Sequence, residues 1–401
     1  MKKAVQTDIV IMGGGIAGLW LLNRLRQSGF SVILLESNSL GGGQTHKAQG
    51  IIHGGMKYAL QGKATAAAQA IANMPGIWKE CLQGNGEIDL SNVPVLSPQQ
   101  YLWSTGSLTT KVAGFFAGLA LKSNTQALDR KDFPDIFQQA EFHGQVYSLD
   151  ETVIDVHALL RELMLPNQDV IFKIDPMEEN QLEFDDKDRL VSLKIHAAPM
   201  QTLQVNAQKY IFTAGEGNEL LLKKLKHHHI NAQRRPLHMV VVKHHFDYAL
   251  YAHCLGLSAT PRLTITTHKA HDGKSIWYLG GQIAEEGVKL SAEEQIQVAK
   301  KELQELFPWL DFSRAEFASF YIDRAENAQP HGSRPDSCYF LEIENSIVAW
   351  PTKLAFAPLL AHEIIECLAK ANIKPCIADM RELRAWPIPA LAKPIWDKLL
   401  P

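Results

Sequence analysis

The stretch that decides the fold is Ile9-Val10-Ile11-Met12-Gly13-Gly14-Gly15-Ile16-Ala17-Gly18. The apolar, β-branched run from Asp8 to Met12 predicts a buried strand that leads directly into Gly-x-Gly-x-x-Gly. Leucines then recur at helical spacing, and a second apolar strand from Ser31 to Leu35 ends on the acid Glu36. A strand, a glycine turn, a helix and a strand ending in an acid therefore follow one another within forty residues.

This order of elements is typical of a dinucleotide-binding unit. Gly13 permits the tight turn, Gly15 lets backbone N–H groups approach a pyrophosphate, and Gly18 lets the helix pack closely on the strand. The helix N-terminus supplies partial positive charge and free donors. Glu36 lies where a carboxylate accepts ribose hydroxyls. A signal peptide is the alternative for the apolar run, but four glycines interrupt it.

Length and composition indicate a globular enzyme of two or more domains. The chain has 401 residues, and its formal net charge of -3 gives no general attraction to nucleic acid. No apolar run is long enough to span a bilayer, so at most peripheral membrane contact is expected. The five cysteines are scattered and form no C-x-x-C pair, which favours reduced thiols in a cytoplasmic protein. His227-His228-His229 is expected to end a solvated helix, and no metal site is predicted.

A second glycine-rich stretch, from Gly41 to Tyr58, indicates backbone lying close to a ligand. Together with the first motif it resembles the FAD-dependent oxidoreductases of the D-amino-acid-oxidase superfamily. The segment Ile51-Ile52-His53-Gly54-Gly55-Met56-Lys57-Tyr58 is similar to a segment of flavin-linked glycerol-3-phosphate dehydrogenases and of L-2-hydroxyglutarate oxidases. The resemblance implies bound FAD.

Later motifs follow the order of the same family. The strand Gln208 to Phe212 ends in Thr213-Ala214-Gly215, which resembles the second flavin motif. His238 opens a strand similar to one whose histidine faces the substrate in the glycerol-3-phosphate dehydrogenases. Near the end, Pro351-Thr352-Lys353-Leu354 stands where relatives have Gly-Gly-Lys-Leu. Proline lacks a backbone donor, so close approach of this backbone to the flavin edge is in doubt.

The flavin contacts that motif and resemblance predict come from four parts of the chain. They are Gly13, Gly15, Ile16, Ala17, Gly18, Glu36, Ser37, Gly43, Gln44, Thr45, Gly50, Ile52, Ala214, Gly215, Thr352, Lys353 and Leu354.

The expected fold class is α/β, with a Rossmann-like FAD-binding domain and a second α+β substrate domain that carries an antiparallel sheet. Residues 1–80, 146–225 and 320–380 are assigned to a discontinuous FAD-binding domain, 81–145 and 226–319 to the substrate domain, and 381–401 to a C-terminal tail. The tail mixes Trp386 and Trp396 with prolines and is expected to pack against the body, with weak membrane contact as the alternative.

The expected chemistry is oxidation of a small anionic hydroxy compound, such as a glycerol-3-phosphate-like molecule or a 2-hydroxy acid. A base near the hydroxyl is needed, and imidazole suits neutral pH; His238 is favoured over His53. The catalytic set is completed by Arg324, which suits a carboxylate or phosphate, and Lys353. The predicted substrate-binding residues are Lys57, Tyr58 and Arg334, of which Arg334 also suits bracing the flavin loop.

Three alternatives stay open at this level. An amine or amino-acid oxidase of the glycine-oxidase type needs the base less, because a neutral amine delivers hydride directly. A non-catalytic flavin-binding protein is suggested by the altered Pro351-Thr352 turn. Covalent attachment of the flavin through His46 is the third. The electron acceptor, oxygen or a quinone, is left undetermined by the sequence.

Overall fold

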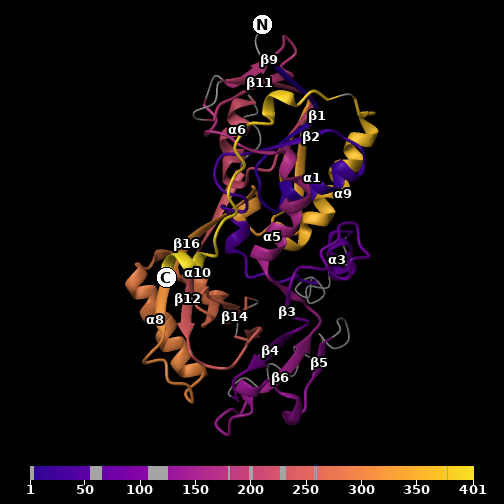
Figure 1. Cartoon of the computed structure of the whole chain (residues 1–401). Helices are drawn as coiled ribbons and strands as arrows, with labels where there is room; N and C mark the ends of the chain where they lie inside the picture. The colour runs from indigo at the N-terminus through magenta and orange to yellow at the C-terminus, as the bar shows by residue number, and fades with distance from the viewer. Residues whose placement is uncertain are drawn as a thin grey trace.

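The computed structural model describes residues 4–54, 66–106, 125–178, 181–197, 202–225, 232–256, 258, 260–376 and 378–401. The molecule has two lobes, each built on one large sheet (Figure 1). The chain crosses between the lobes several times, so each lobe is assembled from separate segments of sequence.

The first sheet is the parallel one expected from the opening motif. Its spatial order is β17 (Tyr339–Ile343), β18 (Ser346–Trp350), β11 (Leu203–Phe212), β1 (Ala4–Met12), β2 (Val32–Glu36) and β8 (Ile171–Lys173). All pairings from β18 to β8 are parallel, and β17 is antiparallel to β18. β10 (Leu190–Ile195) continues antiparallel from β11, and β9 (Leu182–Phe184) pairs with β10.

Alternation along β1 builds a core on each face of this sheet. Ile9 and Ile11 pack beneath a helical layer that contains α1 (Ile16–Gln27), α3 (Ala66–Leu82), α5 (Val156–Met164) and α9 (Ala357–Lys370). Val10 and Met12 face β9, β10 and α6 (Asn218–Lys224) on the other side. A strand that is covered on both faces has apolar residues at consecutive positions. This explains why Ile9 to Met12 are all apolar.

The second sheet is antiparallel except for one pairing. Its order is β16 (Glu316–Asn327), β12 (Ala232–His244), β15 (Ser275–Gly280), β14 (Leu263–Lys269), β13 (Ala252–Cys254), β4 (Gln100–Ser104), β6 (Gln145–Leu149) and β5 (Thr125–Ala127). β13 and β4 run parallel. β3 (Val95–Ser97) and β7 (Val153–Ile154) form a separate two-stranded sheet.

One face of the second sheet packs on α8 (Ala292–Leu306), and α7 (Gln282–Glu286) lies nearby. Ser291 caps α8 with Glu294 in a complete capping box. Short 3-10 turns connect the elements; they are η1 (Thr45–Lys47), η3 (Arg130–Asp132), η4 (Asp135–Phe137), η5 (Leu165–Val170), η7 (Gly215–Gly217), η8 (Gly287–Lys289), η9 (Pro330–Gly332), η10 (Leu354–Phe356) and η11 (Arg381–Leu383).

The C-terminal tail packs on both lobes, in agreement with the expectation of packing against the body. Leu40 exchanges backbone hydrogen bonds with Ala390 and Ala392 in the first lobe. Farther on, α10 (Ile395–Leu399) lies beside β12 in the second lobe (Figure 1). There Trp396 stacks on His268 with ring centroids 4.6 Å apart.

The fold class is the predicted one, and the differences concern lengths. The strand that contains His238 begins six residues earlier than expected, since β12 pairs with β16 from Ala232 to Lys243. The predicted domain boundary at 320 falls inside β16, which belongs to the second sheet. The histidines 227–229 lie outside the described residues.

Candidate active site

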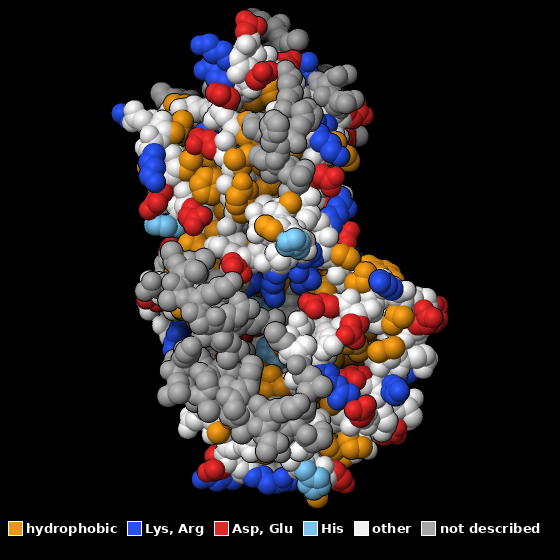
Figure 2. Space-filling view, turned by 180° about the vertical axis from the view of Figure 1, so that it is seen from behind, with side chains coloured by type: hydrophobic (Ala, Val, Ile, Leu, Met, Phe, Trp, Pro, Cys, Tyr) orange, Lys and Arg blue, Asp and Glu red, His pale blue; other side chains and the backbone are white. Residues whose placement is uncertain are grey.

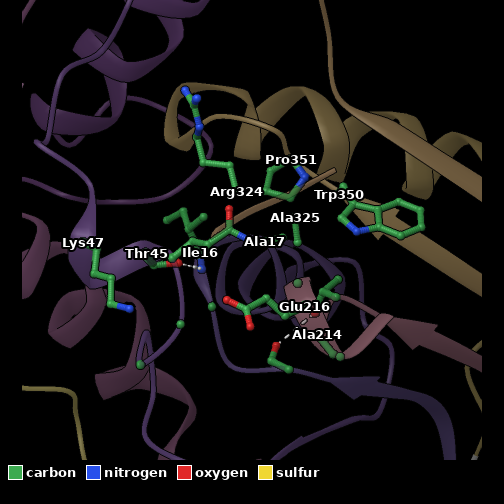
Figure 3. Close-up of a pocket in the computed structure, with 18 of the residues that line it drawn as sticks. Ile16, Ala17, Thr45, Lys47, Ala214, Glu216, Arg324, Ala325, Trp350 and Pro351 are labelled. Carbon is green, nitrogen blue, oxygen red and sulfur yellow. Dashed lines mark hydrogen bonds between the residues drawn. The ribbon is translucent and has the colours of Figure 1, made fainter. Parts of the chain in front are cut away.

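A cavity of about 720 Å³ opens where the carboxyl ends of the parallel strands meet the second sheet. Gly13 follows β1, Ser37 follows β2, Ala214 follows β11 and Pro351 follows β18, and all four line the cavity. This edge is where ligands of open α/β sheets bind. Figure 3 shows residues from these segments, together with Lys47 and Arg324 from other parts of the chain, all of which line the cavity.

The first turn can be built only with glycine at two positions. Gly13 has φ +111°, and a Cβ there would lie 2.6 Å from the carbonyl oxygen of Thr213. A Cβ on Gly18 would lie 2.0 Å from the carbonyl oxygen of Gly13. The same Gly13 oxygen accepts a 2.9 Å hydrogen bond from the Thr213 hydroxyl. The turn therefore packs closely against both α1 and the end of β11.

Side chains from later segments hold the start of α1. Its N-cap, Gly15, has no side chain to offer, and the hydroxyl of Thr45 instead accepts the Ile16 N–H at 3.0 Å (Figure 3). Oε2 of Glu36 accepts the Gly14 N–H at 2.7 Å. The helix N-terminus thus faces the cavity with its backbone fixed, as a diphosphate site requires.

Most of the predicted flavin contacts line the cavity. They are Gly13, Gly15, Ile16, Ala17, Glu36, Ser37, Gly43, Gln44, Thr45, Gly50, Ala214, Gly215, Thr352, Lys353 and Leu354. Gly18 and Ile52 do not line it. Gly18 serves the packing of α1 on the turn, and Ile52 is fully buried in the core beneath the helical layer. For these two, a direct flavin contact stays a prediction that the cavity lining does not support.

The altered turn after β18 keeps the backbone that glycine would adopt. Thr352 has φ 59°, a left-handed conformation that is rare for a β-branched residue. Its hydroxyl donates a 2.9 Å hydrogen bond to the carbonyl of Ser337, which anchors the turn. The next residue, Lys353, places its ammonium 5.0 Å from the centre of the Phe356 ring. Pro351 and Thr352 both line the cavity despite the substitution.

His238 does not face the cavity, and the prediction that it faces the substrate is wrong. Its ring is fully buried, with Nδ1 bonded to the carbonyl of Gly287 and Nε2 to the hydroxyl of Ser319, both at 2.9 Å. Alternation along β12 explains the error: Leu237 and Met239 line the cavity, so the residue between them points to the opposite face.

His46 is likewise turned away from the cavity. It is 7% exposed, and its Nδ1 is bonded to the carbonyl of Gly41 at 2.9 Å. Burial and the neighbouring positive charges of Lys47 and Lys398 lower the pKa of His46. His46 does not line the cavity, so this geometry lends no support to covalent attachment of a cofactor through it.

His53 is the one histidine among the described residues that lines the cavity. Its Nδ1 lies 3.0 Å from Oε2 of Glu151, and Oε1 of the same carboxylate accepts the Gly54 N–H at 2.9 Å. Burial raises the pKa of Glu151, but the charge and hydrogen bond of His53, together with His253 and Gly54, bring it below its ordinary value. Glu151 was missed in the sequence because no motif marks a carboxylate 98 residues away from its partner.

Cations line the same cavity. Lys47, Arg324, Arg334 and Lys353 all contribute to its wall, and Figure 2 shows Lys and Arg side chains gathered between the lobes on one face. Burial, with the positive charge of Arg235 and Arg334, lowers the pKa of Arg324 to about 10, so the guanidinium stays charged at neutral pH.

Arg324 is held by a backbone carbonyl of the neighbouring strand, beside an ion pair that the sequence did not reveal. Its Nε donates to the carbonyl of Arg235 at 3.3 Å, and the Arg235 guanidinium binds Glu326 through Nε and Nη2. Glu326 is 1% exposed. The paired strands β12 and β16 therefore fix the direction of Arg324. Lys57 and Tyr58, the other predicted substrate contacts, lie outside the described residues.

These features define a dinucleotide-binding protein whose cavity suits FAD. The N-terminus of α1 offers donors to a diphosphate, and Glu36 stands at the end of β2 for the ribose. Gly43 lines the cavity, and a Cβ there would meet no atom within 4 Å, so the loop leaves open space for a ligand.

Comparison with known proteins identifies the family. The sequence model of the DAO family, described as FAD dependent oxidoreductase, matches residues 8–345. The chain belongs to this family. A probable FAD-dependent oxidoreductase of Pseudomonas aeruginosa, PA4991, is 44% identical over 401 residues and 99% of each chain. Its crystal structure has a TM-score of 0.84 to this one, at 40% identity over 99% of both chains. The protein is therefore an FAD-dependent oxidoreductase of the D-amino-acid-oxidase superfamily.

More distant structures share the fold alone. L-α-glycerophosphate oxidase from Mycoplasma pneumoniae, solved with FAD bound, is 16% identical with a TM-score of 0.61, covering 91% of this chain and 95% of that chain. Glycine oxidase from Bacillus cereus is 12% identical with a TM-score of 0.64 and the same coverage. A glycerophosphate oxidase and a glycine oxidase thus both have this architecture. Within the described ranges, no helix is both long and apolar enough to cross a bilayer.

Proposed function

We propose that this protein oxidises a small anionic hydroxy compound, a 2-hydroxy acid or a polyol phosphate, with FAD as hydride acceptor. The observation that carries the proposal is His53, which lines a cavity that also holds Arg324, Arg334 and Lys353 and is paired with the buried carboxylate of Glu151. An alcohol needs both a base and, if it is anionic, fixed cations.

Different residues of the chain would carry out proton transfer and substrate binding. FAD, when bound, accepts the hydride from the carbon that carries the hydroxyl group. His53 takes the hydroxyl proton, and Glu151 stabilises the imidazolium that results. Arg324 holds the carboxylate or phosphate with its planar fork, and Lys353 adds a point charge. The apolar Leu237, Met239 and Ile322 on the facing sheet limit access of water.

The test is the anaerobic bleaching of the bound flavin by sn-glycerol 3-phosphate, 2-hydroxy acids and amino acids. Rapid bleaching by a hydroxy compound is expected, and His53→Gln should slow it about 10²–10⁴-fold. His362→Gln is the control, because this histidine lies on the exposed side of α9 with 62% of its side chain accessible. Arg324→Lys should weaken substrate binding and leave the flavin content unchanged.

Two results would contradict this function. Bleaching by amines or amino acids alone, with a rate that His53→Gln leaves unchanged, would favour the glycine-oxidase type of reaction. If no compound of the panel bleaches the flavin, the proposed substrate class is wrong. We further propose oxygen or a quinone as the electron acceptor, and the rate of flavin reoxidation by each distinguishes them.

A further inference from the structure

Glu151 is a buried carboxylate that no flavin motif explains. It lies between β6 and β7, is 3% exposed, and does not line the cavity. A buried carboxylate is costly unless each oxygen is hydrogen-bonded. Both oxygens of Glu151 are satisfied by consecutive residues, Oε1 by the Gly54 N–H and Oε2 by Nδ1 of His53.

This pair of contacts determines which nitrogen of His53 carries the proton. The Gly54 N–H is always a donor, so it fixes one oxygen and holds the carboxyl plane in place. An ionised carboxylate only accepts hydrogen bonds, so Nδ1 of His53 must donate. In the neutral ring Nε2 then has the free lone pair. The side chain of His53 is 37% exposed at the cavity wall, so the ring remains accessible to a substrate.

We propose that Glu151 is a positioning residue that locks His53 in the Nδ1–H tautomer and so makes Nε2 the base. The inference rests on the proposed function for the identity of the base, but the tautomer itself is independent of any substrate. His53 and His253 are the titratable groups that act on Glu151 in the described part of the chain. His253 stacks beside His53 with ring centroids 6.3 Å apart.

The decisive variant is Glu151→Gln, which keeps the size and the acceptor for Gly54. Its amide nitrogen donates to Nδ1 of His53, which forces the proton to Nε2. The base is lost while the geometry is retained. The kcat for flavin reduction should fall about 10²–10⁴-fold with little change in KM. Glu151→Asp keeps a carboxylate and should recover part of the rate.

A spectroscopic readout separates this role from a structural one. Nitrogen-15 NMR of the histidine rings in the flavin-loaded protein reports the tautomer directly, and the His53 signals are assigned by their loss in His53→Gln. We expect Nδ1–H in the wild type and Nε2–H in Glu151→Gln, with equal flavin content. Nε2–H in the wild type, or an unchanged tautomer in the variant, would overturn the proposal.

The two proposals fail in different experiments. If no hydroxy compound bleaches the flavin but the tautomer shifts as expected, the substrate class is wrong and the positioning role stands. If a hydroxy compound bleaches the flavin and Glu151→Gln reacts at the wild-type rate, the function stands and the positioning role is refuted.

Discussion

Gly18 provides the most direct test of how the cofactor turn is built. In Gly18→Ala the new Cβ would lie 2.0 Å from the Gly13 carbonyl oxygen and 2.8 Å from the Thr213 hydroxyl, whereas ordinary contact begins near 3.4 Å. The closest atom is backbone, so no side-chain rotation relieves the contact. Either α1 or the turn must move by more than 1 Å. This movement would strain the hydrogen bond from the Thr213 hydroxyl to the Gly13 carbonyl.

The expected cost follows from this geometry. Overpacking of a dense core costs roughly 1–3 kcal/mol, and the gain of about 1 kcal/mol that alanine brings to a helix offsets part of this cost. The apoprotein should therefore be destabilised by up to about 2 kcal/mol. Donors of the turn that shift by 1 Å lose charge-assisted hydrogen bonds to the diphosphate worth about 1.5–3 kcal/mol each. FAD should bind at least about tenfold more weakly.

The assay combines urea unfolding of the apoprotein with a flavin titration. Gly76→Ala is a matched control, because Gly76 lies exposed in α3 and a Cβ there would meet nothing within 4 Å. The same chemical change should raise stability there by about 0.5–1 kcal/mol and leave FAD affinity unchanged. Equal FAD affinity in Gly18→Ala and the wild type would refute the account of the turn.

Other predictions concern the second lobe and the tail. Hydrogen bonding from Lys243, opposed by burial, holds the pKa of Asp272 at about 2, so its stabilisation is present above pH 3.8 and lost as pH falls toward 2. Asp272→Asn should lower Tm at pH 7, with a difference that shrinks as the pH falls to 2 and vanishes below it; a constant difference would argue against the ion pair. Trp396→Ala should cost about 3–5 kcal/mol in urea unfolding, because the ring is 8% exposed and stacks on His268; a loss under about 1 kcal/mol would show that the tail is loosely held. Ser291→Ala should cost about 1 kcal/mol by loss of the capping box, and an unchanged urea midpoint would contradict it.

The parts predicted well from sequence depend on neighbours along the chain. The unit from β1 to Glu36 is specified by glycines and apolar periodicity within forty residues. The hydroxyl that caps α1 comes from Thr45, which is 29 residues away from its partner. The pair of Arg235 and Glu326 spans 91 residues. Such contacts follow from strand order, which a single sequence does not specify.

The choice between two histidines shows where pattern reasoning needs the fold. His238 was favoured because its strand resembles one that carries a substrate-facing histidine, yet a shift of one position reverses the face of every side chain on a strand. Leu237 and Met239 take the cavity side, and His238 is left with two buried hydrogen bonds. His53 is identified by a different criterion, since a base needs a partner that orients it and an open ring edge. Glu151 and the cavity together satisfy that criterion, so the proposal that His53 is the base depends on contacts and not on motif alone.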